Sequence, residues 1–180
     1  MKKISDFYDP QLPTLLMSIH PEYVNQILQG TKIIEYRKRF FKEKFQAFVY
    51  TTGAQGGIQL FLTCAPAIRD NAQVLAKIGQ NIQHDDFNEI YDYFLPKNTG
   101  CILPILATTS MKKVALSKIR QILPSIAIPQ SYLFLDAPDK LILLNFLLKQ
   151  DAIKHKTNQW EHHFANIANI KKEPTDIRLF

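Results

Sequence analysis

The strongest chemical signal in this sequence is a group of five charged residues within eight positions, namely Lys32, Glu35, Arg37, Lys38 and Arg39. A lysine ammonium is a mobile point charge that suits a phosphate group, and an arginine guanidinium can hold a phosphate or a carboxylate through two parallel hydrogen bonds. Glu35 can accept a hydrogen bond from the amino group of a base, or it can orient Arg37. These residue types favour a binding site for an anionic group.

The spacing of these charges is typical of a β-strand that runs to about Arg39. Alternation along such a strand places Ile34 and Tyr36 on the face toward the core of the fold and Glu35, Arg37 and Arg39 on the other face. Residues i and i+2 lie about 7 Å apart on a strand, so Glu35 and Arg37 can form an ion pair. Two interpretations of this pair stay open: it contacts a ligand, or it only fixes the local geometry.

Aromatic residues provide candidate stacking surfaces for a base. Tyr132 is one candidate and Tyr50 is an alternative, because sites for single-stranded nucleic acids stack bases on aromatic rings. We include Tyr132 with Lys32, Glu35, Arg37 and Arg39 in the predicted ligand-binding set.

Other reactive side chains are assigned structural roles. His20 is expected to be a turn or capping residue. Cys64 and Cys101 lack the spacing of a zinc or redox motif, and free cysteines are commonly small buried residues. The adjacent His162 and His163 do not share a helix face. The sequence therefore predicts no metal, no cofactor and no identified catalytic residue.

The elements that must position the charged residues are a strand and a short helix. Residues 14–19 form an apolar run typical of a buried strand. Pro21 suits the first position of a helix, and Gly30 suits its C-cap. Lys32 is then expected to stand apart, in the turn between Gly30 and the next strand.

Further elements follow along the chain. Asp85 or Asp86, then Ser117 and Asp139, are expected to cap successive helices, and Pro104 is expected at a sheet edge or bulge. The predicted strands are 47–50, 58–63, 101–108 and 131–135, and the predicted helices are 71–78, 85–94, 117–122 and 140–149. This pattern indicates an α+β fold, a small mixed β-barrel with short helical insertions.

The length of 180 residues suits one domain with terminal additions. We expect an N-terminal arm at 1–13, a core domain at 14–135 and a C-terminal helical extension at 136–180 that docks on the core. The first residues have no apolar segment of the kind that signal peptides contain, and no apolar run is long enough to cross a membrane. A cytoplasmic location is therefore the expectation, and nothing in the sequence favours a particular oligomeric state.

The formal net charge of +6 favours an anionic partner. The charge is also segregated along the chain. Residues 31–44 hold six basic and two acidic side chains, whereas residues 84–93 hold four acidic side chains and no lysine or arginine.

The sequence from Gly30 to Arg37 contains the pattern Gly-x-Lys-x-x-Glu-x-Arg, formed by Gly30, Lys32, Glu35 and Arg37. With the strand and helix that precede it, this segment resembles the ASCH domain family of the PUA-like superfamily. A second segment, Pro-Gln-Ser-Tyr at 129–132, resembles a stretch near the end of many ASCH domains. The resemblance covers residues 15–135 and implies a PUA-like β-barrel with a basic cleft beside the first helix, where RNA or a nucleotide-like ligand binds.

Two alternative functions accompany this hypothesis. One bacterial branch that resembles this fold is regarded as acetylcytidine amidohydrolases, which use the motif lysine, a threonine of the same strand and a later glutamate. Lys32 matches that lysine, but Glu35 stands at the threonine position, so the nucleophile is missing. A hydrolase of a modified nucleoside or RNA would need Lys32 as a base, and a neighbouring carboxylate instead favours its charged form. The other alternative is a protein-interaction module whose partner surface is the leucine-rich helix at 140–149 and the tail at 150–180.

Overall fold

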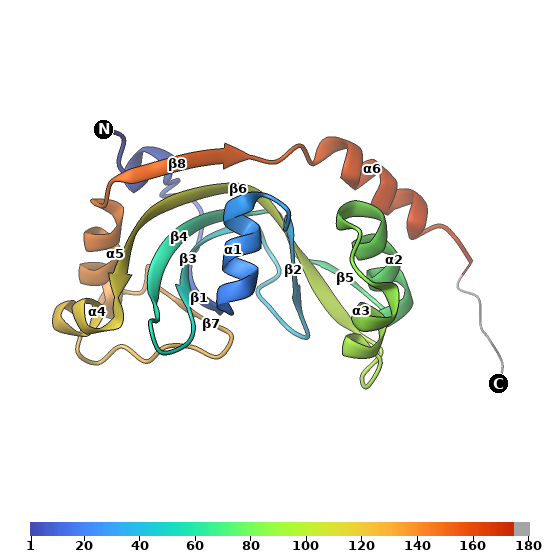
Figure 1. Cartoon of the computed structure of the whole chain (residues 1–180), viewed down its shortest axis with the longest axis horizontal. Coiled ribbons are helices and arrows are strands. Elements are labelled where there is room, and N and C mark those ends of the chain that lie inside the picture. The colour runs from blue at the N-terminus through green and yellow to red at the C-terminus, as the bar shows by residue number, and fades with distance from the viewer. Residues whose placement is uncertain (175–180) are drawn as a thin grey trace.

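The computed structural model describes residues 1–174, and these residues form one curled sheet with helices around it (Figure 1). The strands are β1 Thr14–Ile19, β2 Ile34–Arg37, β3 Phe45–Thr51, β4 Gly57–Cys64, β5 Ile68–Asp70, β6 Gly100–Ala115, β7 Tyr132–Phe134 and β8 Ala152–Thr157. The α-helices are α1 Pro21–Gln29, α2 Ala72–Gln83, α3 Phe87–Phe94, α4 Leu116–Ile122, α5 Leu141–Leu148 and α6 Glu161–Ile170. Short 3-10 turns span Ile4–Phe7 and Pro138–Lys140. The expected mixed α+β fold with a barrel-like sheet is confirmed, in the form of a half-barrel.

Strand β6 organises the sheet because it pairs with four other strands along its 16 residues. The main strand order is β2-β6-β4-β3-β1-β7, with β5 and β8 also paired to β6. Pro104 lies where β6 passes from its pairing with β4 to its pairing with β2, next to a shift of register opposite Thr63 and Cys64. The predicted strand at 101–108 was therefore correct in place and much too short.

Helix α1 forms as its sequence predicts. Pro21 occupies the first turn, and Gly30 ends the helix with a φ of 83°, a left-handed conformation that favours glycine. The Gly30 N–H donates to the carbonyls of Gln26 and Ile27, at 3.0 Å each. Strand β2 follows after a three-residue turn and ends at Arg37, two residues earlier than expected.

Three apolar clusters surround the sheet. One fills the inside of the curl beneath α1, and a second lies on the other face beneath α4 and α5. The third joins β2 and β6 to α2, α3 and α6. Ile34 lies in this third cluster, and Tyr36 packs against it. Both residues face the core, as the alternation predicted. The core that they meet is formed with the helices, whereas packing inside the barrel had been expected.

The C-terminal extension docks on the core and contains more than helices. Residues 152–157 form β8, which pairs antiparallel with the 107–111 stretch of β6; this strand was not predicted. Two predicted caps were wrong: Ala115 is the N-cap of α4 in place of Ser117, and Lys140 precedes α5 in place of Asp139. No helix within residues 1–174 is long and apolar enough to cross a membrane. The last six residues of the expected extension, 175–180, lie outside the described residues.

Asp86 is the N-cap of α3, which settles the choice between Asp85 and Asp86. Its carboxylate accepts the backbone N–H of Glu89 at 2.8 Å. We expect Asp86→Ala to lower the free energy of unfolding by about 0.5–2 kcal/mol, because that N–H then loses its partner. Urea denaturation measures the change, with Asp92→Ala on the exposed side of α3 as the control. Equal stabilities of the two variants would contradict the cap.

Candidate functional site

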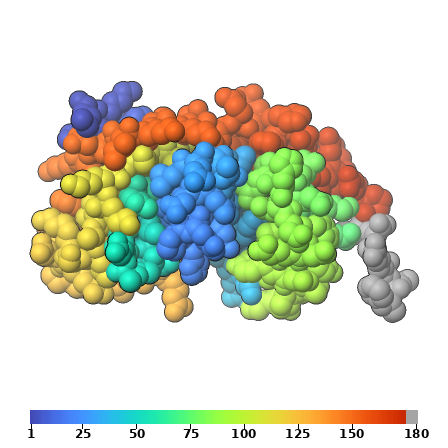
Figure 2. Space-filling model, viewed as in Figure 1, coloured from blue at the N-terminus to red at the C-terminus, as the bar shows by residue number. Residues whose placement is uncertain are grey.

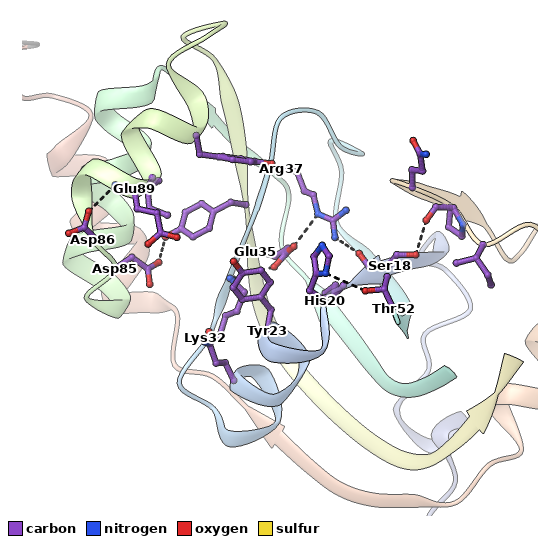
Figure 3. Close-up of a pocket in the computed structure, with 18 residues that line it drawn as sticks. Ser18, His20, Tyr23, Lys32, Glu35, Arg37, Thr52, Asp85, Asp86 and Glu89 are labelled. Carbon is purple, nitrogen blue, oxygen red and sulfur yellow. Dashed lines mark hydrogen bonds and ion pairs between the residues drawn. The ribbon is translucent and has the colours of Figure 1, made fainter. Parts of the chain in front are cut away.

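A cavity of about 890 Å³ lies between α1, β2, α3 and the loop before β7 (Figure 3). Figure 2 shows this side of the molecule, with α1 in blue at the centre and the α2–α3 pair in green beside it. The cavity is lined by Ser18, Ile19, His20, Tyr23, Gln26, Lys32, Glu35, Tyr36, Arg37, Thr52, Asp85, Asp86, Glu89, Ile90, Tyr93, Ile128, Pro129 and Gln130. Both segments that resemble ASCH domains therefore contribute to one cavity.

Glu35 holds two cations at the base of this cavity. Its Oε1 accepts from Arg37 Nε at 3.1 Å, and its Oε2 lies 3.5 Å from Lys32 Nζ. The side chains of Lys32, Glu35 and Arg37 are only 6%, 10% and 13% exposed. Arg37 Nη2 also donates to the carbonyl of Ser18 at 2.7 Å, which ties β2 to the end of β1. The predicted pairing of Glu35 with Arg37 is confirmed.

Lys32 lies in the turn before β2, as predicted, but it is buried and lies beside the Glu35 carboxylate instead of standing apart from the Glu35–Arg37 pair. Its ammonium lies 4.9 Å from the ring centroid of Tyr23 and 5.1 Å from that of Tyr36. Aromatic faces attract a cation at such distances. Lys32 is thus held by two rings and one carboxylate, and it is a fixed part of the cavity wall.

A second network joins this turn to the helical wall of the cavity. The Tyr36 hydroxyl donates to Asp85 Oδ2, and Gln83 Nε2 donates to the same oxygen at 2.6 Å. Gln83 Oε1 accepts the backbone N–H groups of Ile33 and Ile34 at 3.0 and 3.1 Å. Burial raises the pKa of the Tyr36 phenol and its bond to Asp85 raises it further, so the hydroxyl remains a donor at neutral pH.

The charge of the lining differs from the expected basic cleft. Lys32 and Arg37 are the only lysine and arginine among the lining residues, and both are bound to Glu35. Three further carboxylates, those of Asp85, Asp86 and Glu89, lie on the opposite wall. The cavity is therefore mixed in charge, with carboxylates in excess.

Hydroxyl groups at the β1 end of the cavity are already engaged. Ser18 Oγ donates to the carbonyl of Pro129 at 2.7 Å, a backbone-bonding role of the kind expected. Thr52 Oγ1 lies 3.4 Å from His20 Nδ1 at the exposed rim. His20 is the N-cap residue of α1, although its side chain makes no capping bond.

Two residues of the predicted ligand-binding set are not brought into the cavity. Arg39 is exposed beyond the end of β2. Tyr132 packs against Phe40, with ring centroids 4.7 Å apart, and against Phe41. Tyr50, the alternative stacking residue, is buried in the cluster beneath α4 and α5.

Sequence reasoning missed the aromatic residue that α1 contributes to the cavity, and the aromatic and acidic residues of the opposite wall. Tyr23 follows Pro21 by two positions in α1, so the motif helix itself was a signal for it. Tyr93 and Glu89 lie on α3, more than 50 residues from Glu35 along the chain. The only sequence signal for the acidic residues of that wall was the excess of acidic side chains in residues 84–93.

Comparisons with known proteins show the fold. No family model matches the sequence, and no match was found among curated proteins. The structure is similar to the crystal structure of ASCH from Zymomonas mobilis, with a TM-score of 0.67 at 16% sequence identity, covering 79% of this chain and 99% of that one. A mutant of the same Zymomonas mobilis protein matches with a TM-score of 0.63 at 16% identity, covering 79% of this chain and 100% of that one. This chain therefore has an ASCH-like fold.

Proposed function

We propose that this chain binds RNA or a nucleotide-like ligand, and that the cavity between α1, β2 and α3 receives the base. The observation that carries the proposal is the buried Glu35 carboxylate, which Lys32 and Arg37 hold in place at the base of the cavity. A carboxylate has about four acceptor positions, and these two cations leave some of them for a ligand. Carboxylates read the amino group of a base such as cytosine.

The size and the aromatic lining support a planar ligand. A volume of about 890 Å³ lies in the range of about 300–1,000 Å³ typical of small-molecule sites. The rings of Tyr23 and Tyr93 line the cavity from α1 and α3. A base that stacks on such a ring gains about 1–3 kcal/mol.

The same contacts favour binding over hydrolysis. Lys32 Nζ lies 3.5 Å from the Glu35 carboxylate and also lies near the Tyr23 and Tyr36 rings, so these contacts already engage the group that a hydrolase would use as its base. Ser18 donates its hydroxyl hydrogen to Pro129 and is thus occupied as a nucleophile.

We expect Tyr23→Ala to weaken binding roughly 5- to 150-fold, because the base loses its stacking surface. The measurement is calorimetric titration with the four ribonucleosides and their monophosphates, with the fold checked by circular dichroism. Tyr91→Ala is the matched control, since Tyr91 lies on the helix wall but does not line the cavity. If none of these ligands binds, the proposal is overturned. If a ligand is instead converted to a product, the hydrolase function replaces the binding function.

A further inference from the structure

A second, very shallow groove, with a volume of only about 10 Å³, lies on the other flank of α1. It is lined by Ile27 and Leu28 of α1, Thr108 and Ser110 of β6, and Lys154 and Lys156 of β8. Figure 1 shows β8 running beside β6 along the upper rim of the sheet, next to the C-terminal end of α1.

The two lysines of this groove are placed by strand pairing. Lys156 lies opposite Thr108 and Lys154 lies opposite Ser110 in the β6–β8 ladder. Because side chains alternate along a strand, both lysines project from the same face, about 7 Å apart. Paired lysine and hydroxyl side chains are groups that proteins use to contact phosphates.

Unlike the cations of the cavity, these lysines have no carboxylate partner within residues 1–174. Both are exposed. In the cavity, by contrast, Glu35 pairs with both Lys32 and Arg37, and three more carboxylates line the opposite wall, so the lining carries more carboxylates than cations. A polyanion whose base enters the cavity must therefore have its phosphates neutralised elsewhere.

The groove and the cavity meet at the end of α1. A Cβ atom on Gly30 would lie 2.0 Å from Lys156 Nζ, so the ammonium rests directly over this glycine. Gly30 is two residues before Lys32, which lines the cavity. The groove thus borders the turn that forms one wall of the cavity.

We propose that Lys154 and Lys156 bind the phosphate backbone of single-stranded RNA that places one base in the cavity. This inference rests on the proposed function and extends it to an oligonucleotide partner. The backbone passes the C-terminal end of α1 and lies along β8, with Thr108 and Ser110 beside it.

We expect the double variant Lys154→Gln, Lys156→Gln to bind RNA more weakly and with less dependence on salt. Each lost phosphate contact removes about 0.7 from the slope of log affinity against log salt, so two contacts remove about 1.4, or about 25-fold in affinity at 0.1 M relative to 1 M salt. The probe is fluorescent single-stranded RNA of about 12 nucleotides, a length in the range of single-strand sites. Anisotropy is measured at several salt concentrations.

The matched control is Lys42→Gln, Lys44→Gln, which removes the same charge from two exposed lysines between β2 and β3. The proposal that Lys154 and Lys156 bind the RNA backbone is overturned if both double variants change the salt slope equally, or if neither changes it. Binding of mononucleosides without any binding of the oligonucleotide also overturns it and leaves the proposed function standing. Absence of both kinds of binding rejects the two proposals together.

Discussion

Replacing Glu35 with alanine is expected to lower the free energy of unfolding by about 3–5 kcal/mol, because it leaves two buried cations without their shared partner. The side chains of Lys32 and Arg37 are 6% and 13% exposed, so water cannot readily replace the carboxylate. Urea denaturation followed by circular dichroism measures the loss. The same variant is expected to lose ligand binding, since the carboxylate that accepts from the base is gone.

A control and a combined variant separate these two effects. Glu43→Ala removes an exposed carboxylate from the segment after β2 and is expected to change stability by no more than about 0.5 kcal/mol. Combining Lys32→Met, Glu35→Leu and Arg37→Met removes all three charges, and such apolar replacements are often neutral for stability. We expect this combined variant to be more stable than Glu35→Ala and still unable to bind. A Glu35→Ala protein as stable as the Glu43→Ala control would contradict the buried ion pairs.

The parts of the site that the sequence predicted are those that local geometry determines. Pro21 and Gly30 bound a helix through their own backbone preferences, and strand alternation places Glu35 beside Arg37. These features depend on neighbours within a few residues. They could therefore be derived before any tertiary contact was known.

The burial of Lys32 could not be predicted in that way. It depends on a ring from α1 and a ring from β2 that close over the same ammonium. The turn before β2 is in turn held by Gln83, which lies 50 positions away from Ile33. A lysine two residues after a helix-ending glycine gives no sign of such partners, so the sequence indicated a mobile charge.

Strand β8 shows the same limit at the level of the fold. Its residues 152–157 include Lys154, His155 and Lys156, which are polar and mostly exposed. They form a strand because β6 is long enough to offer ladder positions at residues 107–111. Edge strands commonly carry such charged residues, which discourage pairing with other chains. The pattern is thus typical of an edge, but only the partner strand reveals it.

Removing residues 136–180 is expected to prevent stable folding of the remaining chain. Within residues 136–174, the removed segment buries five aliphatic side chains, namely Leu143, Leu144, Leu147, Ile167 and Ile170. At about 1.5–3 kcal/mol each, their burial contributes about 7–15 kcal/mol, which is comparable to the whole stability of a typical domain. Trp160 also donates from Nε1 to the carbonyl of Ile105 at 2.8 Å, and β8 is lost from the sheet.

The truncation is compared with two single substitutions in α5. Leu143 is fully buried and Ile142 is 60% exposed, although they are adjacent in the chain. We expect Leu143→Ala to cost about 2–5 kcal/mol, because it leaves a cavity beneath the helix, and Ile142→Ala to cost no more than about 0.5 kcal/mol. Circular dichroism and urea denaturation measure all three proteins. If residues 1–135 unfold cooperatively with the stability of the full chain, and Leu143→Ala has no effect, α5 and β8 are not part of the folded core. The extension would then be a separate interaction module, which is the alternative function that the sequence analysis left open.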